Sequence, residues 1–325
     1  MNYPTCVICA KSSSVDVAAE IGNRHLFFRC GQCKLLFEDP VRYDSTDDFD
    51  FDIDLDEISE EDQRRFRRTF VEKIDIGESD ELYADYAFED STQMLQYLQQ
   101  RVLGAIEEYQ ETNTDYVPAR VLEVGCADGF LLRALREYFP QIHTVVGIDP
   151  SPVATERGRT HSTDLRTGVL STVDVDGEFD LIIIIGNLML HEDPLDSLKR
   201  AASMLAPGGI IVGDVKNPLA STRLAARWFA QLPSGRRPRL LQNFIDRNFE
   251  NYRFGISKDT LHELARRADL DVLDLSTEPP RALKFKNSHK GSNGLAGFFW
   301  EVSDRLDRLR DERAWLTFVL KEGRG

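Results

Sequence analysis

The sequence predicts an α/β fold: a mostly parallel sheet with helices on both faces, preceded by a small zinc ribbon. Two observations carry this prediction. Short apolar strands alternate with amphipathic helices from residue 120 onward, which is typical of a parallel sheet covered on both sides. Four of the five cysteines fall in the first 33 residues, as two CxxC pairs. We therefore expect two structural units in one chain.

The N-terminal cysteines predict a metal site. Cys6 and Cys9 form CVIC, and Cys30 and Cys33 form CGQC. Two such turns give a closed tetrahedral thiolate site for structural Zn²⁺, and the metal supplies most of the folding energy of so small a unit. Redox or disulfide pairs are the alternative, which is disfavoured because intracellular chains rarely keep structural disulfides. We predict a zinc ribbon over residues 1–41, with a hairpin turn at Gly22–Asn23.

An acidic stretch follows the ribbon. Residues 44–62 hold eleven acidic residues and no basic residue. Within them, DFDFDIDLDEI alternates aspartates with apolar side chains, which predicts a half-buried edge strand. Disorder is the equally weighted alternative for so charged a segment. Residues 42–90 are therefore predicted to be an acidic linker or cap segment.

Regular elements are predicted in order after residue 90. Apolar residues recur at three- and four-residue steps from Ser91, which predicts a helix. Apolar runs then predict strands at 120–124, 144–148, 180–185 and 209–213, and amphipathic patterns predict helices at 129–138, 194–205 and 258–268. Strands and helices in this order imply a sheet whose ligands bind outside the carboxyl ends of its strands.

The loop after the first of these strands is the main functional signal. RVLEVGCADGF places Glu123 before Gly125 and continues with Ala127 and Gly129, and the next strand ends at Asp149. The loop is neither GxGxxG nor GxxxxGK[ST], so dinucleotide and triphosphate fingerprints are absent. It resembles motif I, E/D-x-G-x-G-x-G, of class I S-adenosylmethionine-dependent methyltransferases.

The resemblance covers about residues 91–325 and implies a Rossmann-like seven-stranded methyltransferase sheet with a lid insertion at about 217–253. It implies S-adenosyl-L-methionine as the cofactor, with the loop backbone near its amino-acid end. Glu123 would orient the ammonium group, Asp149 the ribose hydroxyls, and Asn187 would contact cofactor or acceptor. The family's adenine-reading acid is replaced in RTGVLSTVD by Val169 and Leu170, so a backbone contact or Asp174 would serve instead.

Two basic stretches predict where the acceptor binds. Residues 217–253 carry seven arginines against two acids, and residues 281–290 carry four basic residues and no acid. Positive charge at the rim of the site favours an anionic acceptor, with Arg236 and Arg237 as candidate contacts and Tyr252 as a weaker one. The alternative is that these stretches dock on the acidic residues 44–62.

His191 is the candidate catalytic residue. A neutral imidazole after the fourth strand could accept a proton from an acceptor hydroxyl during methyl transfer. The competing interpretation is that His191 only packs or hydrogen-bonds its loop. No catalytic metal is required.

The predicted function is methyl transfer to a small anionic acceptor, such as a sugar or nucleotide-linked sugar. A CxxC–CxxC ribbon ahead of such a domain is similar to methyltransferases of sugar and polysaccharide pathways. The first alternative is a zinc-ribbon RNA base methyltransferase, since related ribbons occur in ribosomal RNA enzymes. The second is a non-catalytic interaction protein with a degenerate cofactor fold, against which the retained Glu123 and Asp149 argue.

Composition narrows the partners and the location. A formal net charge of −15 disfavours nucleic acid as a partner. The longest apolar run, Leu181–Ile185, is far shorter than a membrane span. The start, MNYPTC, lacks the basic and apolar stretches of a signal peptide. We therefore expect a cytoplasmic protein with no membrane partner.

Overall fold

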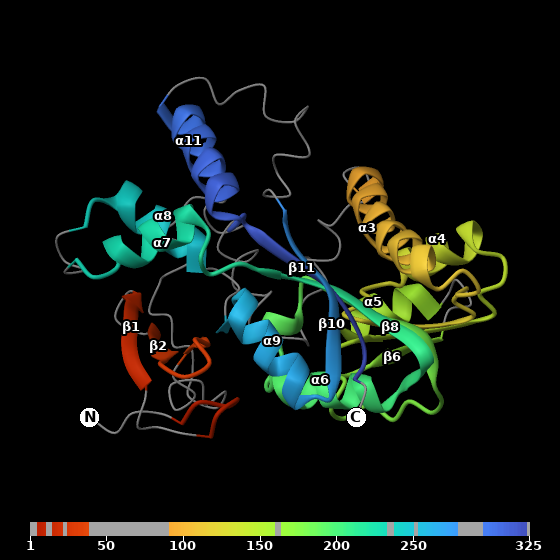
Figure 1. Cartoon of the computed structure of the whole chain (residues 1–325). Helices are drawn as coiled ribbons and strands as arrows, with labels where there is room; N and C mark the ends of the chain where they lie inside the picture. The colour runs from red at the N-terminus through yellow and green to blue at the C-terminus, as the bar shows by residue number, and fades with distance from the viewer. Residues whose placement is uncertain are drawn as a thin grey trace.

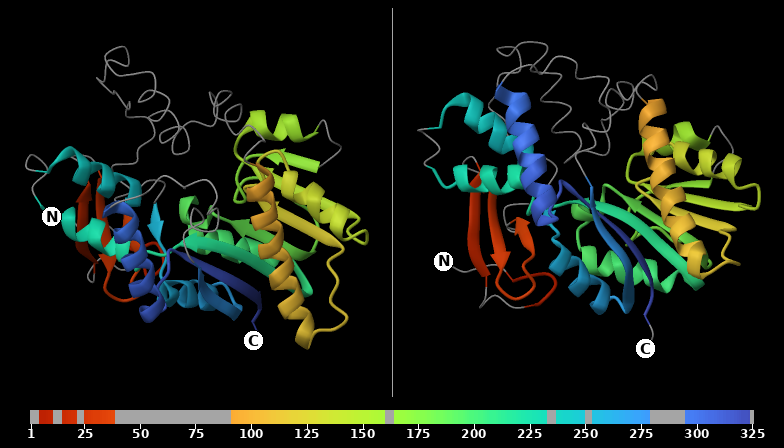
Figure 2. Two further views of the ribbon diagram at one scale, coloured as in Figure 1. Left: turned by 90° about the horizontal axis from the view of Figure 1, so that it is seen from above. Right: turned by 45° about the horizontal axis from the view of Figure 1, so that its top comes forward.

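The computed structural model describes residues 5–10, 15–21, 25–38, 91–159, 164–232, 237–249, 253–278 and 295–323. Two sheets organise these residues (Figures 1 and 2), one with four strands and one with seven. The predicted acidic segment at 42–90, the basic stretch at 281–290, and the candidates Arg236 and Tyr252 lie outside the described residues.

The larger sheet has the strand order β10-β11-β8-β7-β4-β5-β6. Strands β4 to β8 are parallel, and β11 lies antiparallel between β8 and β10. Their bounds are β4 Arg120–Val124, β5 Thr144–Asp149, β6 Asp164–Thr167, β7 Phe179–Ile185, β8 Leu205–Lys216, β10 Leu270–Glu278 and β11 Trp315–Glu322. This confirms the predicted seven-stranded α/β sheet. From β4 the strands are added first on one side, as β5 and β6, and then on the other side, as β7 and β8. Ligands bind at the point where the strand order switches in this way, between β4 and β7.

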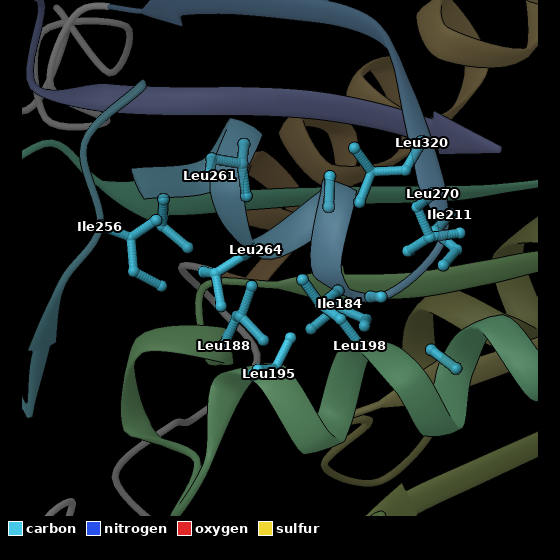
Figure 3. Packing of buried hydrophobic residues seen from close by; sticks show 14 of the residues in the cluster. Ile184, Leu188, Leu195, Leu198, Ile211, Ile256, Leu261, Leu264, Leu270 and Leu320 are labelled. Atoms are coloured by element: carbon cyan, nitrogen blue, oxygen red, sulfur yellow. The ribbon is translucent and has the colours of Figure 1, made fainter. Parts of the chain in front are cut away.

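Helices cover both faces of this sheet. Alternate residues of β4 point to opposite sides: Val121 packs in the core beneath α3 (Ser91–Thr112) and α4 (Phe130–Tyr138). Leu122 packs in the core beneath α6 (Pro194–Ser203) and α9 (Lys258–Arg267). Figure 3 shows the second core, where leucines of α6 and α9 meet side chains of the sheet. The predicted helices at 129–138, 194–205 and 258–268 are confirmed within a few residues.

β8, which corresponds to the strand predicted at 209–213, begins earlier, at Leu205. β8 already pairs with β7 at Leu205, so the LAPGG segment lies within the strand. Gly208 adopts a φ of 79° there, a conformation that glycine reaches without steric cost. The pairing register with β7 shifts between Leu205 and Ile210, so the turn interrupts β8 and does not precede it.

The smaller sheet joins the N-terminal ribbon to the α/β domain. β1 (Val15–Ile21), β2 (His25–Cys30) and β3 (Leu36–Glu38) form an antiparallel ribbon. β3 then pairs with β9 (Phe254–Gly255), which lies just before α9. The fourth strand of the ribbon sheet is thus supplied by the α/β domain, which the sequence did not predict.

Three further helices gather beside the ribbon, as Figures 1 and 2 show. α7 (Ser221–Phe229) and α8 (Arg239–Phe249) lie between β8 and β9, and α11 (Leu295–Arg310) precedes β11. The apolar cluster between the α7–α8 pair and the ribbon consists of Phe27, Leu36, Ala226, Ala230 and Ile245. The segment predicted to be a lid insertion thus contains two helices that pack on the ribbon. No helix among the described residues is long and apolar enough to cross a membrane.

Candidate active site

The loop after β4 repeats one unusual backbone conformation. Gly125, Ala127 and Gly129 have φ values of 76°, 50° and 73°. This left-handed region costs an alanine about 1–2 kcal/mol and glycine almost nothing. The loop turns back so that the amides of Gly125 and Cys126 donate to the carbonyl of Ile148, at 2.7 and 3.1 Å. The loop is thus fixed against the end of β5, at the carboxyl edge of the sheet.

Asp149 is preset by the loop and the start of the next helix. Its Oδ2 accepts from the amide of Ala127 at 2.8 Å, and its Oδ1 accepts from the amide of Ser151 at 2.8 Å. The residue is 5% exposed. Carboxylate oxygens retain further lone pairs beyond these two bonds. The structure therefore brings Asp149 to the loop with its orientation already determined.

Glu123 is buried with an unsatisfied oxygen. It is 6% exposed, and its Oε2 has no hydrogen-bond partner among the described residues. Burial, followed by the charges of Asp149 and Asp128, raises the pKa of Glu123 well above its ordinary value. A buried acceptor of this kind is costly unless a donor reaches it. A ligand that carries an ammonium group would supply that donor, so these residues fit the amino-acid end of the expected cofactor.

Asn187 and His191 form a connected group beside the loop. The Asn187 Nδ2 donates to the carbonyl of Val124 at 2.5 Å. The His191 Nε2 lies 3.2 Å from the Asn187 Oδ1, and its Nδ1 lies 2.9 Å from the Ser197 Oγ. Burial lowers the pKa of His191 to about 4, so the ring is neutral at physiological pH. Both ring nitrogens thus have a protein partner.

Arg237 is not brought to the loop. Its guanidinium donates to the carbonyls of Ala230 and Leu232, each at 2.6 Å from Nη2, and to the Gln242 side chain at 3.2 Å. These contacts close the connection between α7 and α8. Leu170, at one of the positions expected to face the adenine, is also not placed to contact a ligand. It is 2% exposed and packs in the core.

Two residues near the site escaped the sequence analysis. Asp128 is buried, accepts from the amide of Phe130 at 3.2 Å and pairs with Arg133 at 3.3 Å. An aspartate just before a helix is a recognised start signal and could have indicated this role. Ser197 has no such signal, because a serine inside a helix is ordinary until the fold places a histidine beside it.

A second candidate site lies in the ribbon. The four cysteine sulfurs lie within 4.8 Å of one another, all four residues are buried, and none is in a disulfide. The Cys6 and Cys33 sulfurs are 3.6 Å apart. Zinc–sulfur bonds of about 2.3 Å in a tetrahedron place sulfurs about 3.8 Å apart. The arrangement therefore fits a four-thiolate Zn²⁺ site.

Helix α9 contacts both halves of this cysteine cluster. The Thr260 Oγ1 donates to the Cys33 carbonyl at 2.9 Å. The Arg267 guanidinium donates to the Ile8 carbonyl and lies 4.0 Å from the Cys9 sulfur. Donors beside ligating groups orient a metal site and tune it. The α/β domain thus provides the outer contacts of the cluster.

The fold and the loop define a Rossmann-like α/β domain with a ligand site at the carboxyl edge of its sheet. A family model described as a methyltransferase domain matches residues 94–275, more than half of the chain. The chain belongs to this family of methyltransferase domains. The family match includes the loop, Asp149, Asn187 and His191, but not the cysteine cluster.

The chain is also similar to individual methyltransferases. The ubiquinone biosynthesis O-methyltransferase of Xanthomonas campestris pv. campestris is 27% identical over 176 residues, which cover 49% of this chain and 65% of that protein. The chain thus spans less than two thirds of that relative. The tRNA U34 carboxymethyltransferase of Syntrophotalea carbinolica is 33% identical over 103 residues, covering 29% of this chain and 31% of that protein. The plantazolicin methyltransferase BpumL in complex with SAH has a TM-score of 0.49 at 15% identity, covering 81% and 99% of the two chains.

Proposed function

We propose that the protein transfers a methyl group from S-adenosyl-L-methionine to a small anionic acceptor, such as a sugar or nucleotide-linked sugar. The observation that carries the cofactor assignment is the buried, unsatisfied Glu123 beside the left-handed loop at Gly125. The cofactor would supply a methyl group activated by a positively charged sulfur. Glu123 would bind the ammonium end and Asp149 the ribose, so that the loop holds the reacting end in place.

The acceptor is proposed from charge and from the relatives. Residues 217–253 carry a net charge of +5 and residues 281–290 a net charge of +4, in a chain of −15. In the sequence these stretches follow β8 and β10, two strands whose carboxyl ends lie at the same edge of the sheet as the loop. The ubiquinone biosynthesis relatives are named as O-methyltransferases, which supports a hydroxyl as the methylated group.

Calorimetry with S-adenosylhomocysteine tests the cofactor assignment. We expect the full, metal-replete chain to bind it, and Glu123→Gln and Asp149→Asn to bind at least about tenfold more weakly, because each loses a charge-assisted hydrogen bond. The control is Glu301→Gln, which loses only an exposed ion pair with Arg305 in α11 and should bind like the wild type. Absence of binding by the wild-type chain would contradict the proposal and would favour a non-catalytic interaction protein.

The acceptor class is tested by product formation. The chain is incubated with S-adenosylmethionine and pairs of phosphorylated and unphosphorylated sugars, and S-adenosylhomocysteine is measured. We expect turnover with an anionic member of a pair and a raised KM in Arg236→Glu. Arg237 is unsuitable for charge reversal, because its contacts close the α7–α8 connection. Equal turnover of charged and uncharged members would reject an anionic acceptor.

We infer that the ribbon cysteines bind one structural Zn²⁺. The support is the four buried sulfurs within 4.8 Å of one another and the contacts from α9. Such a site has no open position for a substrate, so the metal would hold the ribbon and take no part in methyl transfer. Metal analysis of the purified chain should give about one zinc per chain and about none for Cys6→Ser/Cys33→Ser.

A further inference from the structure

The side chain of Asn187 occupies the space above Gly125. A Cβ atom on Gly125 would lie 2.0 Å from the Asn187 Nδ2. The same nitrogen donates to the carbonyl of Val124, the residue before the glycine. Asn187 therefore determines how far the end of β4 can turn before the cofactor loop begins.

The hydrogen bonds of this group have a fixed direction. Because the Asn187 Nδ2 donates to a carbonyl, the Asn187 Oδ1 is the atom that faces His191. An amide oxygen only accepts, so the His191 Nε2 must carry the proton. In a neutral ring the Nδ1 is then an acceptor, and the Ser197 hydroxyl donates to it. Ser197 thus donates to His191, His191 donates to Asn187, and Asn187 donates to the Val124 carbonyl.

Both ends of this chain of hydrogen bonds are held by the fold. Ser197 lies in α6, whose first turn is capped by the Asp193 side chain accepting from two amides. Between Asn187 and His191, the short helix Leu188–Leu190 buries Leu188 completely. Figure 3 shows Leu188 between leucines of α6 and α9. The core therefore holds the two elements that flank His191 in position.

We propose that Ser197, His191 and Asn187 form a positioning relay that holds the loop at Gly125 in its cofactor-binding conformation. His191 is a positioning residue that acts through Asn187, because neither ring nitrogen is available to accept a proton from a substrate. The relay rests on the proposed function, since it concerns the same cofactor site. It replaces the interpretation of His191 as a general base.

Binding of S-adenosylhomocysteine separates the two roles, because a general base is not needed to bind this product. We expect His191→Ala and Asn187→Ala to weaken its binding about ten- to hundredfold, since each leaves a buried polar partner unsatisfied. His191→Gln can still donate to the Asn187 Oδ1 and should stay within about threefold of the wild type. The matched His191→Leu has no donor at that place and should bind as weakly as His191→Ala.

Two outcomes would overturn the relay. One is wild-type affinity in His191→Ala, with binding by the wild-type chain intact; loss of binding by the wild-type chain itself would instead reject the proposed function. The other comes from nitrogen NMR of the wild-type chain with labelled histidine, assigned by the signals missing from His191→Gln. We expect a protonated Nε2 and an unprotonated Nδ1 at neutral pH. A protonated Nδ1 would reverse the direction and reject the relay, even if His191→Ala failed to fold.

Discussion

Glu123 is buried and has a raised pKa, whereas the sequence predicts only its role as a ligand contact. Its place before the loop predicts a ligand contact, and the structure adds that it is buried beside two other carboxylates. Because burial and these charges raise its pKa, the free protein holds Glu123 protonated more readily than an exposed glutamate. A bound ammonium group reverses this preference, since an opposite charge favours the ionised carboxylate.

Cofactor binding should therefore release a proton from Glu123. We expect protons to be released when S-adenosylhomocysteine binds, because the raised pKa favours the protonated carboxyl in the free protein and the ammonium group favours the carboxylate. The measurement is the calorimetric binding enthalpy in buffers of different ionisation enthalpy, which should be more exothermic in Tris than in phosphate. Glu123→Gln has no proton to release and should show a smaller difference. Equal enthalpies for the wild type in both buffers would show that Glu123 is already ionised.

His191 gives a second prediction, for stability against pH. Its pKa is lowered from 6.5 to about 4 in the folded chain. Between these values the unfolded chain binds the proton and the folded chain does not. Stability from this residue is therefore full above about pH 6.5 and is lost as the pH falls toward 4, by up to about 3 kcal/mol. Urea unfolding of the wild type and His191→Gln should show the wild type losing more stability over this range; parallel loss would contradict the assignment.

The residues also show where sequence reasoning stops. The positions of Glu123 and Asp149 at the loop could be predicted, because the motif after the first strand and the acid that ends the second resemble the methyltransferase pattern. The partners of His191 could not, because Asn187 and Ser197 reach it through the geometry of a short helix and a helix start. Arg237 was predicted as an acceptor contact from its charge alone, and charge does not reveal that its guanidinium donates to the carbonyls of Ala230 and Leu232, just after α7.

At the scale of elements, the loop after β4 is constrained at its first residue, Gly125. Gly125 has both a left-handed conformation and a neighbouring side chain in the space of a Cβ. We expect Gly125→Ala to lower stability by about 1–2 kcal/mol and to weaken S-adenosylhomocysteine binding at least about tenfold. Thermal unfolding and calorimetry measure the two effects.

The control for this substitution is Gly104→Ala in helix α3. A Cβ there would meet nothing within 4 Å, and alanine favours helices over glycine by about 0.5–1 kcal/mol. Gly104→Ala should therefore raise the unfolding temperature and leave binding unchanged. If the two variants behaved alike, the close approach of Asn187 to Gly125 would not matter for the site.

The larger helices and strands could be predicted from sequence, but the short strand that pairs the ribbon with the α/β domain could not. Strand and helix periodicity in the α/β domain is strong, so the strands at 120–124, 144–148, 180–185 and 209–213 lie within the observed ones. β9 has only two residues, too few for any periodic pattern. Its pairing with β3 depends on contacts between distant parts of the chain, which no local pattern encodes.

For the whole molecule, the ribbon and the α/β domain share one core. The cluster beneath α6 and α9 includes the ribbon residues Cys6, Ile8 and Leu35. α7 and α8 pack on the ribbon residues Phe27 and Leu36. Disturbance of the cysteine cluster should therefore spread beyond residues 5–38 into α7, α8 and α9.

Metal removal tests this coupling. We expect a chelator to lower the unfolding temperature of the full chain and to increase hydrogen exchange in the ribbon, in 221–249 and in 254–267. Exchange in β4 and β5 should change less, because these strands lie in the interior of the sheet. Adding Zn²⁺ should restore the original pattern. Increased exchange confined to the ribbon would show that the two units are independent.

The contact between α9 and the cysteines also bears on synthesis of the protein. Thr260 and Cys33 are separated by 227 residues, so at typical elongation rates the ribosome needs about 10–50 s to make the second after the first. Throughout that interval the nascent thiols have no helix to cover them and are open to oxidation. We therefore expect the yield of native protein in cells to depend on zinc supply during translation more than on zinc added after lysis.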